Sequence, residues 1–255
     1  MRPQTPTLAA VRPILLVRND AFETFGVAPA ALAQAGAPTR IWEAVDGELA
    51  PPLDDVSGVI VFGSSYNVEH ADEQPFIERA AALSRGAVER GVPLLGVCFG
   101  AQLLAWGLGA PIRKAPAREV GFEPIALTDA GGTDPLIDHY EPGDRVFQWH
   151  MDTYDLPDGA QLLASGEQVA NQAFRVGPSA WGVQFHFEID DTEIHLWLEE
   201  FAKEGDLERD WGKSAEQVLS EADRYLAEHQ RKGAEVFRRF ASVARDVAET
   251  ARTAR

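Results

Sequence analysis

The stretch PLLGVCFGAQLLAWG, residues 93–107, holds the only cysteine of this 255-residue chain. A short apolar run ends at Cys98, and a helix-like apolar segment begins directly after it. This order predicts a strand, a sharp turn and a helix, with small residues at positions 96, 100 and 101 that keep the turn uncrowded. Such a turn raises the middle side chain above a sheet and aims the next backbone amides at one point, as in a nucleophile elbow.

Cys98 has two interpretations at this stage. The amino end of a helix favours a thiolate over a thiol, which suits a nucleophile. The alternative is ordinary core filling, because free cysteine is among the most buried residue types. One cysteine cannot form an intrachain disulfide, so the chain suits a reducing, cytoplasmic compartment. The turn alone does not decide between the two.

Apolar runs and helix-like segments alternate on both sides of this turn. Near-continuous apolar runs lie at 13–18, 39–45, 54–65 and 92–100, and helix-like segments at 27–36, 74–91 and 99–109. This alternation predicts a parallel sheet covered by helices on both faces. Shorter strand-like pieces separated by Gly, Pro and Asp turns follow at 120–128, 145–150, 161–166, 171–177 and 180–189. The predicted fold class is therefore α/β, with an open, mostly parallel sheet and a small antiparallel section.

The C-terminal part differs from the rest. Residues 203–213 are polar and predict a connector, and the text SAEQ from Ser214 has the form of a helix capping box. Apolar residues then recur at three- and four-residue steps up to Val247, with an expected interruption at Gly233. We expect a domain over 1–202 and a helical extension over 203–255. Packing of this extension against its own core is the favoured interpretation, and a partner-binding helix is the alternative.

The charge excludes two classes of partner. The net charge is −17, and residues 203–255 carry 11 acidic and 11 basic residues, so the excess of acids belongs to the first part. Such a surface repels nucleic acid and anionic membranes. The N-terminus has no apolar core ending in a cleavage site, so no signal peptide is predicted. Residues 91–112 are long enough to span a bilayer but contain Pro93, Pro111, Gln102 and several glycines, which argue against a membrane helix.

A thiolate nucleophile needs a base and a group that orients the base. The stretch WGVQFHFEID, residues 181–190, offers His186 and Glu188. In a strand both side chains would project from one face, and Glu188 would fix the imidazole tautomer that serves Cys98. Taken alone, the pair could equally be a partly buried histidine beside a surface acid. Together with the predicted elbow, it favours a Cys–His–Glu triad.

These residues resemble the class I (triad) glutamine amidotransferases, in particular the stand-alone ones that look like the glutaminase domain of GMP synthetase. The matching stretches are GVIVFGSSYNV at 58–68, GVPLLGVCFGAQLLA at 91–105, VFQWHMDTYDLPDGAQLLASG at 146–166, NQAFRVG at 171–177 and AWGVQFHFE at 180–188. The resemblance covers about residues 13–200 and implies a flavodoxin-like sheet.

The resemblance implies a role for each matching residue. Cys98 resembles the nucleophile, His186 the base and acid, and Glu188 the group that orients it. Backbone amides that would hold the oxyanion are implied at Gly63, Ser64 and Phe99. Substrate-binding positions are implied at Gln102, His150 and Asp152, although His150 and Asp152 could instead cap a turn. The resemblance implies no metal and no organic cofactor.

Three departures from the family pattern stand out. Gly63-Ser64 replaces a double glycine, which keeps an amide donor but restricts a peptide flip. GAQ replaces GHQ after the nucleophile, and HFE replaces HPE. The changes at Ala101 and Phe187 should not affect the chemistry. The histidines at 70, 139, 195 and 229 show no metal-ligand spacing, and no GxxxxGK[ST] loop occurs.

Three functions remain open from the sequence. The first is a glutaminase that passes ammonia to a separate synthase chain. The second is a stand-alone γ-glutamyl hydrolase that acts on γ-glutamyl peptides or amides with the same covalent chemistry. The third is a scaffold subunit that kept the fold and lost turnover. The intact Cys98, His186 and Glu188 argue against the third.

Overall fold

A computed structural model describes residues 11–253, and these contain a nine-stranded mixed sheet in the order β2-β1-β3-β4-β9-β8-β7-β5-β6. The strands are β1 (Ile14–Arg18), β2 (Thr39–Glu43), β3 (Gly58–Val61), β4 (Leu94–Val97), β5 (Ile112–Leu127), β6 (Arg145–Tyr154), β7 (Gln161–Gly166), β8 (Ala173–Val176) and β9 (Ala180–Val183). The helices are α1 (Ala28–Gln34), α2 (Pro75–Glu89), α3 (Phe99–Gly107), α4 (Asp191–Glu204), α5 (Leu207–Trp211) and α6 (Ala215–Thr253). Short 3₁₀ helices lie at η1 (Leu53–Asp55), η2 (Val68–His70) and η3 (Gly131–Thr133).

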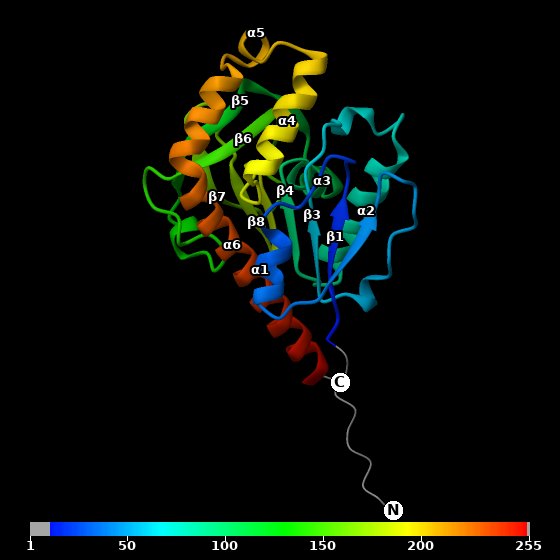
Figure 1. Cartoon of the computed structure of the whole chain (residues 1–255). Helices are drawn as coiled ribbons and strands as arrows, with labels where there is room; N and C mark the ends of the chain where they lie inside the picture. The colour runs from blue at the N-terminus through cyan, green and yellow to red at the C-terminus, as the bar shows by residue number, and fades with distance from the viewer. Residues whose placement is uncertain (1–10, 254–255) are drawn as a thin grey trace, which may run out of the picture.

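The parallel half of the sheet has helices on both faces, as predicted. Strands β2, β1, β3, β4 and β9 run parallel, so their carboxyl ends meet at one edge. Successive residues of β1 alternate between two cores: Ile14 and Leu16 pack with α1 and α6, whereas Leu15 and Val17 pack with α2 and α3. Figure 1 shows α6 running diagonally across the sheet beside α1.

The other half of the sheet is antiparallel, from β9 through β8, β7 and β5 to β6. The prediction of a short strand at 120–128 was wrong in length, because β5 has 16 residues and begins at Ile112. Its first half contains Pro116, which is unusual within a strand. The ladder with β6 shifts register between Lys114 and Glu119, and a proline is tolerated at such an irregularity because no ladder hydrogen bond is required there.

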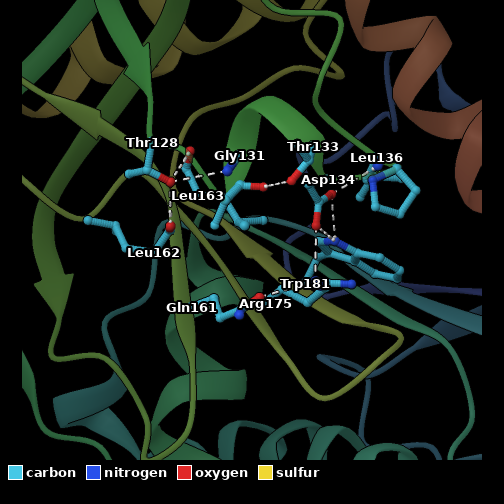
Figure 2. A network of polar contacts seen from close by, with 12 residues as sticks. Thr128, Gly131, Thr133, Asp134, Leu136, Gln161, Leu162, Leu163, Arg175 and Trp181 are labelled. Atoms are coloured by element: carbon cyan, nitrogen blue, oxygen red, sulfur yellow. Dashed lines mark hydrogen bonds and ion pairs between the residues drawn. The ribbon is translucent and has the colours of Figure 1, made fainter.

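A buried polar network connects the segment after β5 to the middle of the sheet (Figure 2). Asp134 accepts a hydrogen bond from the indole N–H of Trp181 on β9 at 3.1 Å and pairs with Arg175 on β8 at 3.2 Å. Thr128 donates its hydroxyl hydrogen to the carbonyl of Leu162 at 2.7 Å. Burial raises the pKa of Asp134, although these donors and Arg175 oppose the shift. The network braces β9, the strand that leads to His186.

The predicted connector at 203–213 contains a helix, so that prediction was wrong in part. Helix α5 begins after Asp206, whose carboxylate accepts a hydrogen bond from the amide of Arg209 at 3.0 Å. An aspartate in this position satisfies a helix N–H that otherwise lacks a partner, which is why a polar stretch can start a helix here. The helix ends at Trp211, which packs against aromatic residues of α4 and β6.

Helix α6 confirms the predicted capping box and corrects the predicted interruption. Ser214 and Gln217 exchange hydrogen bonds between their side chains and amides, at 3.2 and 2.7 Å. The helix runs unbroken through Gly233, where a Cβ atom would lie only 1.8 Å from the carbonyl oxygen of Phe187. The glycine therefore permits close packing and does not end the helix. The apolar face of α6 is buried in the chain's own cores, as the favoured interpretation predicted. Within residues 11–253 no helix has both the length and the apolar character that crossing a membrane requires.

Candidate active site

Cys98 lies in the tight turn between β4 and α3, at the carboxyl edge of the parallel strands. Its backbone has φ 49° and ψ −107°, a conformation that non-glycine residues rarely adopt and that often marks a functional site. Two glycines make the turn possible. A Cβ at Gly100 would lie 1.9 Å from the carbonyl oxygen of Val61, and one at Gly96 would lie 2.5 Å from the backbone of Gly100.

His186 and Glu188 lie beyond the end of β9, so the prediction that they occupy a strand was wrong. Strand β9 ends at Val183, whose carbonyl accepts a hydrogen bond from the amide of Cys98 at 2.7 Å. The ladders of β9 with its neighbours β4 and β8 both end at Val183, so the later residues do not continue them. The two side chains meet nevertheless, with 2.6 Å between Nδ1 of His186 and Oε1 of Glu188.

The charges around His186 favour its protonated form. Burial alone would lower the pKa of His186, but the adjoining Cys98 and Glu188 outweigh burial and raise that pKa well above its usual value. Gln184 donates a hydrogen bond to the sulfur of Cys98 at 3.5 Å. The structure thus brings Cys98, His186 and Glu188 together in the order sulfur, imidazole, carboxylate. An imidazole so placed can exchange a proton with groups that react at the sulfur.

The residues predicted to hold an oxyanion border the same point. Gly63 follows β3, and a Cβ there would lie 3.0 Å from Cε1 of His186. Ser64 donates its hydroxyl hydrogen to the carbonyl of Asn19 at 3.0 Å, which anchors the turn to the end of β1. Phe99 is the first residue of α3, where a helix leaves its amides without internal partners. Their role in holding charge stays a prediction.

The residues predicted to bind substrate form a buried polar group of their own. Gln102 donates to the carbonyl of Asp152 at 3.2 Å. His150 lies within hydrogen-bond distance of the same carbonyl at 3.1 Å and of the carboxylate of Glu119 at 2.9 Å. The carboxylate of Asp152 pairs with Lys114 at 3.0 Å. None of the three predicted residues lines the cavity that reaches His186, and their binding role stays a prediction.

A cavity of about 210 Å³ opens beside His186. Its walls come from the loop after β1, the turn after β3, strand β6 and helix α4. The lining includes Asp20, Phe22, Glu23, Trp149, Trp197, Glu200 and Phe201. Sequence reasoning did not assign these residues a role. The only signal was position, since Asp20 and Glu23 directly follow a buried strand at the edge where Cys98 was expected.

Three buried carboxyl groups lie behind the imidazole. Glu193 accepts a hydrogen bond from the amide of Thr24 at 2.8 Å, and Glu23 accepts one from the amide of Phe25 at 2.6 Å. Burial and the nearby Glu188 raise the pKa of Glu193 to about 7. Burial, Glu193 and Glu188 together raise the pKa of Glu23 well above its usual value. Glu23 and Glu193 therefore hold a proton more readily than an exposed glutamate does, while Glu188 pairs with His186.

Helix α6 contacts the segment that carries the imidazole. Nε2 of His229 lies 2.8 Å from the carbonyl oxygen of His186. A carbonyl oxygen can only accept, so Nε2 of His229 donates this hydrogen bond, and burial lowers the pKa of His229. One helical turn further on, Gly233 lies against Phe187. Among the described residues no three His, Cys, Asp or Glu side chains converge as a metal site would require.

The fold and this site together define a class: an α/β protein with a cysteine in a strand-to-helix turn and a histidine–glutamate pair at the same sheet edge. The family model of class I glutamine amidotransferases matches residues 30–204. The chain therefore belongs to the class I glutamine amidotransferase family.

Curated relatives and solved structures agree with this assignment. The glutamine amidotransferase-like protein YfeJ of Salmonella typhimurium is 35% identical over 146 residues, which cover 56% of this chain and 61% of YfeJ. A glutamine-hydrolysing GMP synthase of Porphyromonas gingivalis is 34% identical over 167 residues, which cover 64% of this chain and 31% of that enzyme. The chain thus spans only part of the length of these relatives.

Among solved structures, a glutamine amidotransferase from Thermotoga maritima has a TM-score of 0.80 and 26% identity, covering 90% of this chain and 97% of that one. A glutamine amidotransferase from Methylobacillus flagellatus has a TM-score of 0.83 at 24% identity, covering 91% and 95%, and this likeness shows the fold alone.

Proposed function

We propose that this chain hydrolyses the γ-amide of glutamine through a γ-glutamyl thioester on Cys98. One observation carries the proposal: Cys98, in a strained turn at the sheet edge, adjoins an imidazole that is paired with Glu188 at 2.6 Å. A nucleophile, its base and the group that orients the base are the three parts that covalent acyl transfer needs.

Each residue takes a defined role in the proposed reaction. The thiolate of Cys98 attacks the γ-carbonyl carbon, and the resulting oxyanion accepts hydrogen bonds from amides at Gly63, Ser64 and Phe99. The carbon–nitrogen bond then breaks, and the imidazolium of His186 gives its proton to the departing nitrogen. Water next attacks the thioester while His186 takes a proton from it, which releases glutamate and restores the thiolate. Gln102, His150 and Asp152 would support the glutamyl end.

We further propose that the ammonia passes to a separate synthase chain. One relative supports this step. The glutamine-hydrolysing GMP synthase from Porphyromonas gingivalis matches this chain over only 31% of its own length, so most of that enzyme lies outside the match. The chain resembles the part of such an enzyme that hydrolyses glutamine. On this proposal, hydrolysis is slow in the isolated chain and faster in the presence of the partner.

A stand-alone γ-glutamyl hydrolase is the second candidate, and one observation favours it. The cavity of about 210 Å³ adjoins His186, the residue that would protonate the leaving nitrogen. Space at this position suits a leaving group larger than ammonia. The chemistry at Cys98 would be the same, and no second chain would be needed.

One experiment tests both candidates. The purified chain and its Cys98→Ala variant are incubated with glutamine, a γ-glutamyl dipeptide and glutathione, and the release of glutamate is measured. Preference for glutamine, lost in the variant, supports the glutaminase. Preference for a γ-glutamyl peptide, also lost in the variant, supports the hydrolase. Hydrolysis that survives in Cys98→Ala would refute the thioester, and no release from any of the three would favour a scaffold or a strictly partner-dependent enzyme.

A further inference from the structure

The cavity beside His186 is larger than ammonia requires. It measures about 210 Å³, whereas a water molecule, which is similar in size to ammonia, takes up about 30 Å³ of the liquid. Because the imidazole forms part of the wall, any group attached to the leaving nitrogen would extend into this space. The cavity is large enough for an amine of several heavy atoms.

Aromatic rings form one corner of the cavity. The rings of Trp149 and Trp197 lie 6.0 Å apart at 85° to each other. The ring of Phe201 lies 6.0 Å from that of Trp149 at 61°, and the ring of Trp197 lies 4.8 Å from that of His186. The first two pairs are edge-to-face contacts, and an aromatic face that no neighbouring ring covers can attract a cation through its negative π-surface. This corner begins directly beside the imidazole.

Carboxyl groups, together with Ser64, Ser65 and the imidazole of His186, form the polar wall. Asp20, Glu23 and Glu200 line the cavity, and none of its described lining residues is Lys or Arg. Asp20 is held in place by hydrogen bonds from the amide and hydroxyl of Ser65 at 2.8 and 2.6 Å. Glu200 pairs with Lys203, which is not part of the wall. The carboxylates of Asp20 and Glu200 attract a cationic ligand and repel an anionic one.

Glu23 is only 4% exposed and lies beside other carboxyl groups, and burial with Glu193 and Glu188 nearby raises its pKa. The protonated form of a carboxyl group carries no charge, but its carbonyl oxygen can still accept a hydrogen bond from an ammonium group. Glu23 therefore adds a hydrogen-bond acceptor to the cavity wall.

We propose that this cavity binds the leaving group of γ-glutamyl amides whose amine carries a second, distal ammonium group. The proposal rests on the proposed hydrolysis at Cys98. The bond between the γ-carbon and the amide nitrogen breaks, the sulfur takes its place on carbon, and the nitrogen takes a proton from His186. Water then replaces the sulfur. The products are glutamate and the free diamine, and no further reactant is required.

Three γ-glutamyl amides that differ only at the far end test the proposal. The amines are butane-1,4-diamine, pentylamine and 5-aminopentanoate, which end in an ammonium, a methyl and a carboxylate after four methylene groups. We expect kcat/KM for glutamate release to be at least tenfold higher for the ammonium amide than for the methyl amide, and lowest for the carboxylate. The glutamyl part is the same in all three, so the ratios report on the leaving group alone.

Two variants of helix α4 test whether the cavity wall causes the preference for the ammonium amide. Glu200→Gln removes a carboxylate from the cavity wall and should reduce the ratio of ammonium to methyl amide at least threefold. Glu199→Gln makes the same charge change at an exposed position of α4 that does not line the cavity, and should leave the ratio unchanged. Titration calorimetry with Cys98→Ala measures binding of the same amides without turnover. There we expect at least tenfold tighter binding of the ammonium amide.

The outcomes separate this inference from the proposed function. Equal or faster hydrolysis of the methyl or carboxylate amide would overturn the inference. Hydrolysis of glutamine without hydrolysis of any of the three amides would also overturn it, and the proposed function would stand. If neither glutamine nor the amides are hydrolysed and Cys98→Ala binds none of them, both fail. Selective binding of the ammonium amide by Cys98→Ala supports the cavity's role even without turnover.

Discussion

The raised pKa of Glu193 leads to a prediction about stability. Glu193→Gln imitates the protonated carboxyl group, since the amide oxygen can still accept the hydrogen bond from the amide of Thr24. In the folded protein the pKa of Glu193 is raised to about 7 by burial and by Glu188. In the unfolded chain a glutamate has a pKa near its ordinary value of about 4.3. The folded state therefore binds more protons between these two values, and its stability falls as the pH rises through them.

The size of the effect follows from the two pKa values. Each unit of difference corresponds to about 1.4 kcal/mol, so the whole difference is worth about 4 kcal/mol. Between pH 5.5 and 8.5 only the part above pH 5.5 is lost, which amounts to about 2 kcal/mol. The glutamine variant does not titrate and escapes this loss. We expect the variant to gain about 2 kcal/mol relative to wild type across this range.

Urea unfolding at the two pH values measures this difference. Titrating groups that do not contact Glu193, including the buried histidines, contribute to both proteins and cancel in the comparison. Glu199→Gln is the matched control, because it removes the same charge from an exposed position of α4. If wild type and Glu193→Gln lose equal free energy of unfolding between pH 5.5 and 8.5, Glu193 does not hold the proton and the reasoning is wrong.

Three further predictions concern the surroundings of the site. Gly233→Ala would place a methyl group 1.8 Å from the carbonyl oxygen of Phe187. Helix α6 must then move by roughly 1 Å, and kcat should fall about 100-fold. A variant with unchanged kcat and a more stable helix would contradict this prediction. Arg175→Met leaves Asp134 buried without its cation. The free energy of unfolding, measured by urea denaturation, should fall by about 2 to 4 kcal/mol. A loss below about 0.5 kcal/mol would show that the pair contributes little to stability. Glu188→Gln removes an anion that raises the pKa of the His186 imidazole. Alkylation of the Cys98 thiol by iodoacetamide at pH 7 should therefore slow at least tenfold. An unchanged rate would exclude this electrostatic coupling.

Local sequence was sufficient for the turn that holds Cys98. The apolar run, the flanking small residues and the helix-like apolar segment after it are all contiguous, so the strand, turn and helix could be predicted together. The same holds for the alternation of strands and helices up to residue 112, since each element there is defined by its own composition. The capping box at Ser214 is likewise a pattern of four adjacent residues.

Contacts between distant segments could not be predicted in this way. Glu193 and Thr24 lie 169 positions apart, and neither belongs to a periodic pattern that points to the other. Gly233 has the composition of a helix breaker, and only its approach to Phe187 explains why a glycine occurs within a continuous helix. The resemblance implied substrate binding at His150, but the pairing of His150 with Glu119 depends on the irregular register between β5 and β6.

The segment of His186 and Glu188 shows how the structure replaces what a strand would have provided. A strand would hold these residues through ladder hydrogen bonds, but β9 has already ended. Instead, the amide of His186 donates to β6 at 2.8 Å, and the carbonyl of His186 accepts from α6 at 2.8 Å. The carbonyl of Glu188 accepts from the start of α1 at 2.9 Å. Glycines permit the close approach on two sides, because a Cβ at Gly26 would lie 1.9 Å from the Glu188 carbonyl oxygen and one at Gly233 would lie 1.8 Å from that of Phe187. A base that must meet a thiol needs a fixed backbone, and here three separate elements of the fold supply it.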